Sequence, residues 1–171
     1  MRQSHAFLNH RVVVAVALAL AANGSSSLSA QIQSSVFLGT WTLDVARSKV
    51  DYGALPKSQV RTYEVAAAGG GIRLSVEGVD GAGATFAYSA NGDFNGKDYP
   101  FVGAGTRNGG DTVSWKPIDA FTIDAIVKKA GSVVNATRLV VSRDGKALTI
   151  TENGTGPNGR ATHGVRVYKK R

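Results

Sequence analysis

The end of the chain carries the side chains best suited to binding a charged small molecule. Arg166 and Tyr168 are two positions apart, so on a β-strand they share one face, and Val165 and Val167 share the other. If Arg166 and Tyr168 face inward, they can bind an anionic head group by charge-assisted hydrogen bonds. If the valines face inward, Arg166 is exposed or stacked on a tryptophan. The cost of burying an unpaired arginine favours the second orientation.

Two tryptophans, Trp41 and Trp115, lie on alternating apolar segments and are expected in the core, where large aromatic side chains usually pack. The alternative is that they form a stacking platform for a ligand. The residues expected to line a hollow interior are Trp41, Phe86, Tyr88, Trp115, Phe121, Ile123, Arg166 and Tyr168.

Catalytic and metal chemistry have little support in this sequence. The chain has no cysteine, and His163 is the only histidine after residue 30, so we predict no metal site and no cofactor. A serine triad would have to use His163, and no Gly-x-Ser-x-Gly motif accompanies it. The segment 154–159 matches Gly-x-Gly-x-x-Gly by letter, but a strand rather than a helix follows it, which predicts a hairpin loop.

Paired carboxylates leave one enzymatic alternative open. The pairs Asp93/Asp98 and Asp119/Asp124 are close in sequence and could support sugar hydrolysis. Each pair flanks a turn or a strand end, where aspartate is common for conformational reasons. We therefore predict a non-catalytic protein and keep a hydrolase as the alternative.

The strands that position these residues are recognisable by alternation of apolar and polar side chains. Three Asx-Gly pairs, Asp80-Gly81, Asn95-Gly96 and Asp144-Gly145, predict hairpins, because both turn residues must tolerate positive φ. The expected strands are 37–44, 60–66, 72–77, 85–89, 99–102, 112–116, 121–128, 133–141, 147–151 and 162–169.

Most connections between these strands are too short for a crossover helix, which predicts an antiparallel meander. The longer connection, 45–58, is expected to form a helical turn or an Ω-type loop over one end. Closure into a barrel of eight to ten strands removes both edges. A membrane-spanning barrel is the competing closed form, but charges such as Arg73, Glu77 and Asp124 interrupt the outward apolar band that it needs.

The N-terminus predicts export. Arg2 and Arg11 precede the apolar run 12–22, and small residues lead to Ala30, which is the pattern of a secretory signal peptide over 1–30. An uncleaved anchor is the alternative, but a membrane helix needs roughly 20 apolar residues. We expect a flexible segment over 31–36, the barrel domain over 37–170, and no integral membrane segment after cleavage.

The chain is basic, with a net charge of +8, but its lysines and arginines are scattered. Nucleic-acid binding would need a basic stripe interleaved with stacking aromatics, so a solvated basic surface is the simpler interpretation. An exported chain without cysteine indicates a periplasmic or extracellular bacterial protein.

The two ends of the predicted barrel resemble a known superfamily. Gly39-x-Trp41 resembles the Gly-x-Trp first strand of the calycins, which include lipocalins and fatty-acid-binding proteins, and Arg166-x-Tyr168 resembles the last strand of the fatty-acid-binding proteins. In the latter family the arginine and tyrosine bind the ligand carboxylate inside the cavity. In lipocalins an arginine near the last strand packs over the tryptophan, which would place Arg166 on Trp41.

The chain departs from both families. The segment 45–58 has no room for the helical lid of the fatty-acid-binding proteins, and the disulfides of lipocalins are missing. The chain is also similar to uncharacterised bacterial exported proteins that end in a Val-x-Val-Tyr-x-Lys strand. The resemblance implies a lipocalin-like barrel.

Three functions follow from this sequence. We predict an exported, monomeric, non-catalytic protein that binds a small hydrophobic or amphipathic ligand, including an anionic one. The first alternative is a structural or interaction protein of the cell envelope with a filled barrel, and the second is the carboxylate-pair hydrolase. Cavity volume separates the first two, because a ligand site needs roughly 300 Å³ or more.

Overall fold

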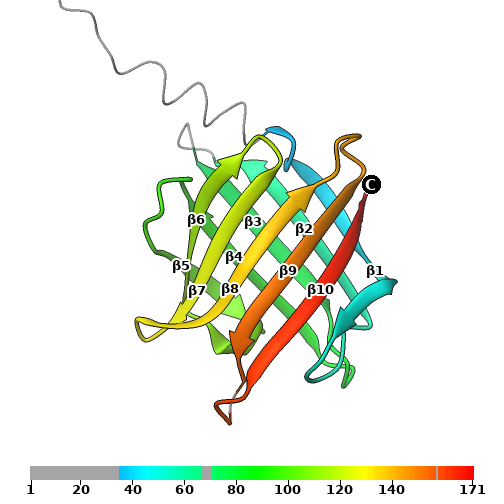
Figure 1. Ribbon diagram of the computed structural model, residues 1–171, viewed down its shortest axis with the longest axis vertical. Helices are drawn as coiled ribbons and strands as arrows, with labels where there is room; N and C mark the ends of the chain where they lie inside the picture. Colours follow the sequence, from blue (N-terminus) through cyan, green and yellow to red (C-terminus); the bar gives the residue numbers. More distant parts are fainter. Residues whose placement is uncertain (1–34, 67–70, 157) are drawn as a thin grey trace, which may run out of the picture.

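The computed structural model describes residues 35–66, 71–156 and 158–171. The predicted signal peptide over 1–30 lies outside the described residues, as does 31–34 of the predicted flexible segment. Ten antiparallel strands form a closed barrel in which each strand pairs with its neighbour in sequence and β1 pairs with β10 (Figure 1). The strands are β1 Gly39–Val50, β2 Ser58–Val65, β3 Ile72–Val79, β4 Thr85–Gly92, β5 Tyr99–Ala104, β6 Thr112–Asp119, β7 Thr122–Lys129, β8 Ser132–Val141, β9 Ala147–Thr155 and β10 Ala161–Lys170. The predicted meander and its closure are confirmed.

The first strand is longer than predicted. β1 continues to Val50, so the expected loop over 45–58 shrinks to 51–57. The register between β1 and β10 shifts between Asp44 and Lys49, which marks a β-bulge. Ser48 makes this bulge tolerable: its hydroxyl donates to the Asp44 carbonyl at 2.7 Å and accepts from the Val167 N–H at 3.0 Å. The side chain thereby satisfies a backbone N–H that the shifted ladder would leave unpaired.

The hairpin turns lie where they were predicted, but their backbone differs in detail. At two of the predicted turns positive φ is confined to the glycine, Gly96 (φ 75°) and Gly145 (φ 69°). Ala130 (φ 48°) and Gly131 (φ 77°) form the two-residue connection between β7 and β8 in which both φ angles are positive. This is the backbone of a type I′ turn, which suits the twist of the flanking strands.

The two sequence ends meet at the seam that closes the barrel. Trp41 lies opposite Lys170, Leu43 lies opposite Tyr168, and the Arg171 N–H donates to the Thr40 carbonyl at 2.9 Å. The Lys170 ammonium stands 5.0 Å from the centroid of the Trp41 ring. The expectation that Arg166 packs over Trp41 is therefore wrong. Arg166 lies four residues before Lys170 on β10, which is about 13 Å at the rise of a strand.

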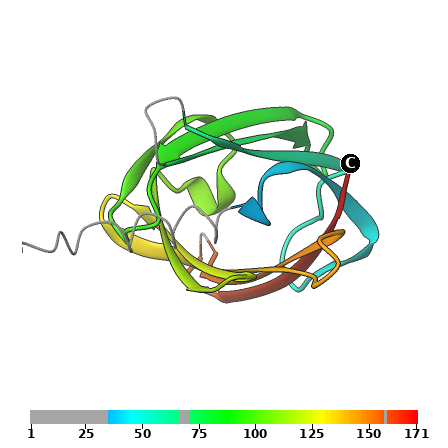
Figure 2. The same cartoon turned by 90° about the horizontal axis from the view of Figure 1, so that it is seen from above.

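One end of the barrel is closed by the segment that precedes β1. Figure 2 shows this segment turning into the ring of strands. Phe37 is completely buried, and its carbonyl accepts a hydrogen bond from the Trp41 indole N–H at 2.8 Å. Val36 and Leu38 pack against the same core cluster. We call this the closed end.

The opposite end, which we call the open end, carries the loops over 51–57 and 80–84 and the short 3₁₀ turn η1, Arg107–Gly109. Asn108 ties η1 to the barrel wall, because its amide donates to the Val134 carbonyl at 3.1 Å. Within the described residues, no helix is long and apolar enough to cross a membrane.

Candidate functional site

The interior side chains of β2, β3 and β4 are arranged in three rows that descend from the open end. Strand pairing sets these rows, since residues directly opposite one another point to the same side of a sheet. The row nearest the open end is Gln59, Gly78 and Phe86; the middle row is Arg61, Val76 and Tyr88; the lowest row is Tyr63, Leu74 and Ala90.

Arg166 faces the interior and is neutralised there. Its side chain is about 6% exposed, and Nη1 lies 2.7 Å from Oε1 of Glu152, whose side chain is equally buried. The favoured prediction, with the valines inward and Arg166 outside, is wrong. The desolvation cost that supported it applies to an unpaired arginine, whereas β9 supplies a buried carboxylate. The Nε of Arg166 is also buried and has no hydrogen-bond partner among the described residues.

Tyr168 is completely buried and shares the inward face with Arg166. Its hydroxyl donates to Oε1 of Gln59 at 2.6 Å. Burial raises the pKa of Tyr168 to about 12, so the phenol remains a neutral hydrogen-bond donor at physiological pH.

Arg61 is a second arginine that faces the interior. Its Nε and Nη2 donate to the Tyr63 hydroxyl at 3.2 and 3.1 Å. Its guanidinium carbon lies 5.7 Å from the Tyr63 ring centroid and 5.8 Å from that of Tyr168, within the range of cation–π contacts. No carboxylate among the described residues forms a salt bridge with it.

The open end leads into a cavity of about 320 Å³, which we call the mouth cavity. A smaller inner cavity of about 50 Å³ has Arg61, Asn135 and Glu152 among mainly apolar lining residues. Tyr88 lines both cavities. Its ring lies 6.3 Å from that of Phe86 and packs edge-on against Phe101 at 5.4 Å, so Tyr88 stands between the two spaces.

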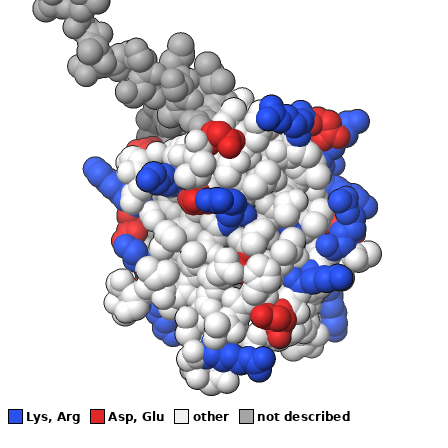
Figure 3. Space-filling view, viewed as in Figure 1, with Lys and Arg blue, Asp and Glu red and all other residues white. Residues whose placement is uncertain are grey.

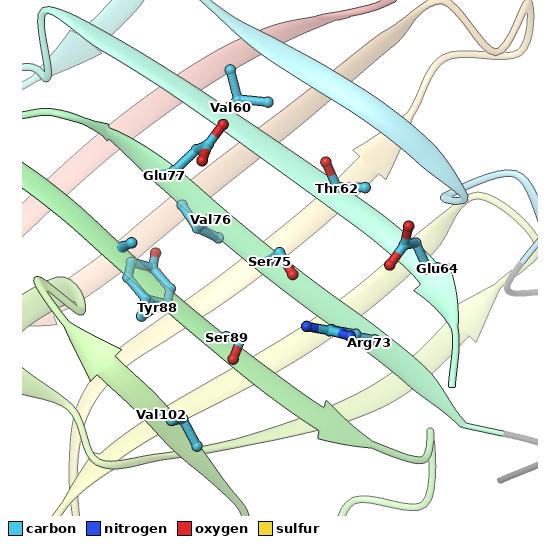
Figure 4. A pocket seen from close by; sticks show the side chains of 11 residues that line it. Val60, Thr62, Glu64, Arg73, Ser75, Val76, Glu77, Tyr88, Ser89 and Val102 are labelled. Carbon is cyan, nitrogen blue, oxygen red and sulfur yellow. The ribbon is translucent and has the colours of Figure 1, made fainter. Parts of the chain in front are cut away.

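A larger hollow of about 490 Å³ lies on the outside of the barrel, over β2 to β5 (Figure 4). It is lined largely by outward side chains such as Glu64, Arg73 and Glu77, all exposed. Because it is a shallow, solvated surface of mixed charge, it lacks the desolvated walls that strengthen polar recognition. We therefore place the candidate site in the interior, despite its smaller volume.

The structure brings some of the predicted ligand-binding residues together and separates others. Phe86, Tyr88 and Arg166 line the mouth cavity, and Trp115 joins Tyr88 in the inner cavity. Ile123 and Tyr168 are buried in the interior, and Trp41 is buried toward the closed end. Phe121 lies in the turn between β6 and β7, 5.1 Å from the Arg143 guanidinium, and lines neither cavity.

The interior residues that were not predicted include four polar ones: Gln59, Arg61, Tyr63 and Glu152. On β9 the signal was present, because Leu148, Ile150 and Glu152 alternate in phase. On β2 it was absent, because Val60, next to Arg61, favours the opposite phase. Only pairing with β1 and β3 shows that Arg61 faces inward.

The four aspartates of the proposed hydrolase pairs are engaged in surface contacts. Asp98 pairs with Lys128 at 2.7 Å, and the Tyr99 hydroxyl donates to Asp93 at 3.3 Å. The Arg138 guanidinium holds the pKa of Asp124 below its ordinary value, and the Phe121 N–H lowers that of Asp119. A general acid needs a raised pKa, which neither of these two has.

His163 is exposed on β10, and its Nδ1 lies 2.9 Å from Oδ1 of Asn153. Within the part of the chain that the structure describes, no group of three or more histidine, aspartate or glutamate side chains could hold a metal ion. On the face drawn in Figure 3, lysines and arginines lie mainly toward the edges, and basic and acidic side chains lie side by side near the upper centre.

Comparison with known proteins gives a fold likeness and no family. No model of a protein family matches the chain, and no curated protein is similar enough to be matched. Among solved structures, the chain is similar to a redesigned β-barrel, mFAP1, bound to DFHBI, with 9% identity and a TM-score of 0.44. The likeness covers 83% of this chain and 98% of that one, and is too distant to assign a ligand.

Proposed function

We propose that this protein is a non-catalytic binding protein that takes up a small amphipathic molecule through the open end of its barrel. The observation that carries the proposal is the mouth cavity of about 320 Å³. This volume lies at the lower end of the range of small-molecule sites, which is roughly 300–1,000 Å³.

The lining of the mouth cavity supports an amphipathic rather than a purely apolar ligand. Phe86 and Tyr88 offer aromatic surface on one side, and Gln59, Asn108 and Arg166 offer polar groups on the other. Specific sites usually combine mainly apolar walls with a few convergent polar groups in this way. The small volume favours a compact molecule of two or three rings or with a short chain.

The biological setting is part of the same proposal. The leader over 1–30 supports export to the periplasm or the exterior, and the Gly39-x-Trp41 strand supports a distant place among lipocalin-like calycins. We propose that the exported barrel acts as a monomer, because closure leaves no unpaired sheet edge for another copy.

The second candidate is a filled barrel that serves as a structural or interaction protein. It is favoured by the closed end, where Phe37 and Trp41 fill the interior, and by an inner cavity of only about 50 Å³. In this alternative the mouth cavity holds only water.

Titration with a neutral fluorescent probe, N-phenyl-1-naphthylamine, separates the two candidates. Binding is expected for the native chain and strongly weakened by Ala54→Trp, because Ala54 lines the mouth cavity and a large side chain there fills it. Ala82→Trp is the matched control, since Ala82 is an exposed alanine on another open-end loop outside the cavity. Native mass spectrometry of the secreted protein then identifies any co-purified ligand. Absence of probe binding, or equal binding by both variants, would reject the ligand-binding proposal.

A further inference from the structure

Among the described residues, the interior of the barrel holds one more basic than acidic side chain on its strands. Among the strand side chains that the structure describes, Arg61, Arg166 and Glu152 are the charged groups that face the interior. Asp80 also lines the mouth cavity, from the loop over 80–84, where its carboxylate accepts hydrogen bonds from the Gly83 and Ala84 N–H groups. Arg166 and Glu152 neutralise each other at 2.7 Å. No salt bridge joins Arg61 to a carboxylate of the described residues. This is costly, because desolvation penalises an unpaired charge.

The neighbours of Arg61 do not supply the missing charge. A guanidinium is always protonated in proteins and has five N–H donors. Two of those of Arg61 reach a single phenol oxygen, that of Tyr63. Burial keeps the pKa of Tyr168 at about 12 and raises that of Tyr88, so both remain neutral. The rings of Tyr63 and Tyr168 give cation–π stabilisation but no negative charge.

Arg61 lies directly below the proposed ligand site. It shares the middle row with Tyr88, one row below Gln59 and Phe86, which line the mouth cavity. It also lines the inner cavity. At about 50 Å³, this cavity is too small for a whole ligand, yet it exceeds the share of liquid volume of one water, about 30 Å³. A space of this size has room for a small head group beside Arg61.

We propose that Arg61 is the anion-binding residue of the barrel interior, and that the ligand is a singly charged organic acid which enters acid-first past Tyr88. This inference rests on the proposed function and specifies its ligand class. The body of the ligand occupies the mouth cavity, and the carboxylate or sulfonate descends to Arg61. Arg166 is the poorer anchor, because the Glu152 carboxylate at 2.7 Å already neutralises it, whereas no carboxylate among the described residues forms a salt bridge with Arg61.

A matched pair of fluorescent probes tests this assignment. 8-Anilinonaphthalene-1-sulfonate and N-phenyl-1-naphthylamine share one aromatic skeleton, and only the first carries an acidic group. The native protein is expected to bind the sulfonate at least about tenfold more tightly, since a hydrogen bond to a charged group is worth more than a factor of ten. Arg61→Met is expected to remove this preference while leaving the affinity for the neutral probe within about twofold.

Two further variants sharpen the result. Arg73→Met is the control, because it removes the same charge from an exposed position on the outer face of β3 and should leave the preference unchanged. Arg61→Lys keeps the charge but loses the planar fork, and is expected to retain part of the preference. It also allows the test to proceed if Arg61→Met does not fold.

The outcomes distinguish this inference from the proposed function. If neither probe binds, the proposed function fails. If the neutral probe binds at the mouth cavity but the sulfonate has no advantage, or if Arg61→Met and Arg61→Lys both keep the full advantage, only the role of Arg61 is overturned. Loss of the preference in Arg166→Met but not in the Arg61 variants would assign the anion to Arg166 instead.

Discussion

At the scale of single residues, Glu152 offsets the desolvation cost of the inward orientation of Arg166. Burying one ion in a protein costs several kcal/mol, and the cost is offset only by a well-placed partner. Gly164 lies opposite Glu152, so the β9–β10 ladder brings the carboxylate within two residues of Arg166 on the neighbouring strand. The two side chains are 2.7 Å apart, and Arg166 lines the mouth cavity whereas Glu152 lines the inner cavity.

Breaking this pair tests the balance of interior charge. Glu152→Gln is expected to lower the free energy of unfolding by about 3–5 kcal/mol, because it leaves the Arg166 cation buried without a counterion. Arg61→Met should change it by less than about 1 kcal/mol, since it removes an already unpaired cation and keeps an apolar stem. Urea unfolding measures both. Equal losses of unfolding free energy for the two variants would contradict the argument that Arg61 has no counterion among the described residues.

Tyr168 gives the protein a component of alkaline sensitivity. Folding raises the pKa of its phenol from 10.0 to about 12 through burial, so the stabilisation is complete below pH 10 and is lost as the pH rises toward 12. Tyr168→Phe lacks this component, and its free energy of unfolding should fall less steeply over that range. Tyr52→Phe, at an exposed loop position, is the control and should follow the native curve. Parallel curves for native protein and Tyr168→Phe, measured by urea unfolding at stepped pH, would contradict the argument.

At the scale of elements, strand phase decides which side chains reach the interior. β2 places Gln59, Arg61 and Tyr63 inside, and the valine between the first two faces out. This orientation buries polar side chains, against simple hydrophobic alternation. The hydrogen bonds from Tyr168 to Gln59 and from Arg61 to Tyr63 offset the cost of burying them. A slip of one residue would exchange the two faces, so the pairing with β1 and β3 must hold the register.

The turn between β7 and β8 contains an avoidable strain. Ala130 has φ 48°, a left-handed conformation that costs an alanine roughly 1 kcal/mol and a glycine little. Ala130→Gly is therefore expected to raise the free energy of unfolding by about 0.5–1 kcal/mol. Ala82→Gly, in a loop where the alanine has no positive φ, should lower it slightly because only the unfolded chain gains freedom. Calorimetric melting of both variants decides, and a stabilised Ala82→Gly would contradict this explanation.

At the scale of the whole molecule, the two ends of the barrel differ in chemistry. The closed end is filled by Phe37, Trp41 and their neighbours, whereas the open end carries the mouth cavity and the polar rows beneath it. The buried aromatic side chains at the filled end contribute hydrophobic stabilisation, and at the open end the buried Nε of Arg166 has no hydrogen-bond partner among the described residues. A ligand site at one end is compatible with a stable core at the other.

Phe37→Ala tests this division of roles. Removing a completely buried phenylalanine should cost about 3–5 kcal/mol of stability, through lost transfer energy and the cavity left behind. Binding of N-phenyl-1-naphthylamine at the open end should persist in the folded variant, at an affinity close to the native value. Leu38→Ala, at a half-buried neighbour, should cost clearly less. A large loss of binding in folded Phe37→Ala would show that the two ends are coupled.

Local patterns were enough to predict most of the barrel. Alternation located all ten strands, and short glycine-containing turns implied a meander that closes on itself. The structure shows that its ends meet where Trp41 lies opposite Lys170. They failed at the end of β1, because the Ser48 hydroxyl replaces a backbone partner across a bulge that alternation does not reveal. They also placed Phe121 in the ligand site, because its apolar character does not distinguish a turn from a cavity wall.

The sequence by itself determined that Gly39-x-Trp41 lies on the first strand and Arg166-x-Tyr168 on the last strand of one antiparallel barrel, because both strands are recognisable from local alternation. Only the tertiary structure decided which way Arg166 points, since its counterion lies on another strand and Lys170, not Arg166, covers Trp41. The tertiary structure also revealed Arg61, whose phase depends on two neighbouring strands. The physical reason is the same for both arginines: the cost of a buried charge depends on partners that strand pairing brings from elsewhere in the chain.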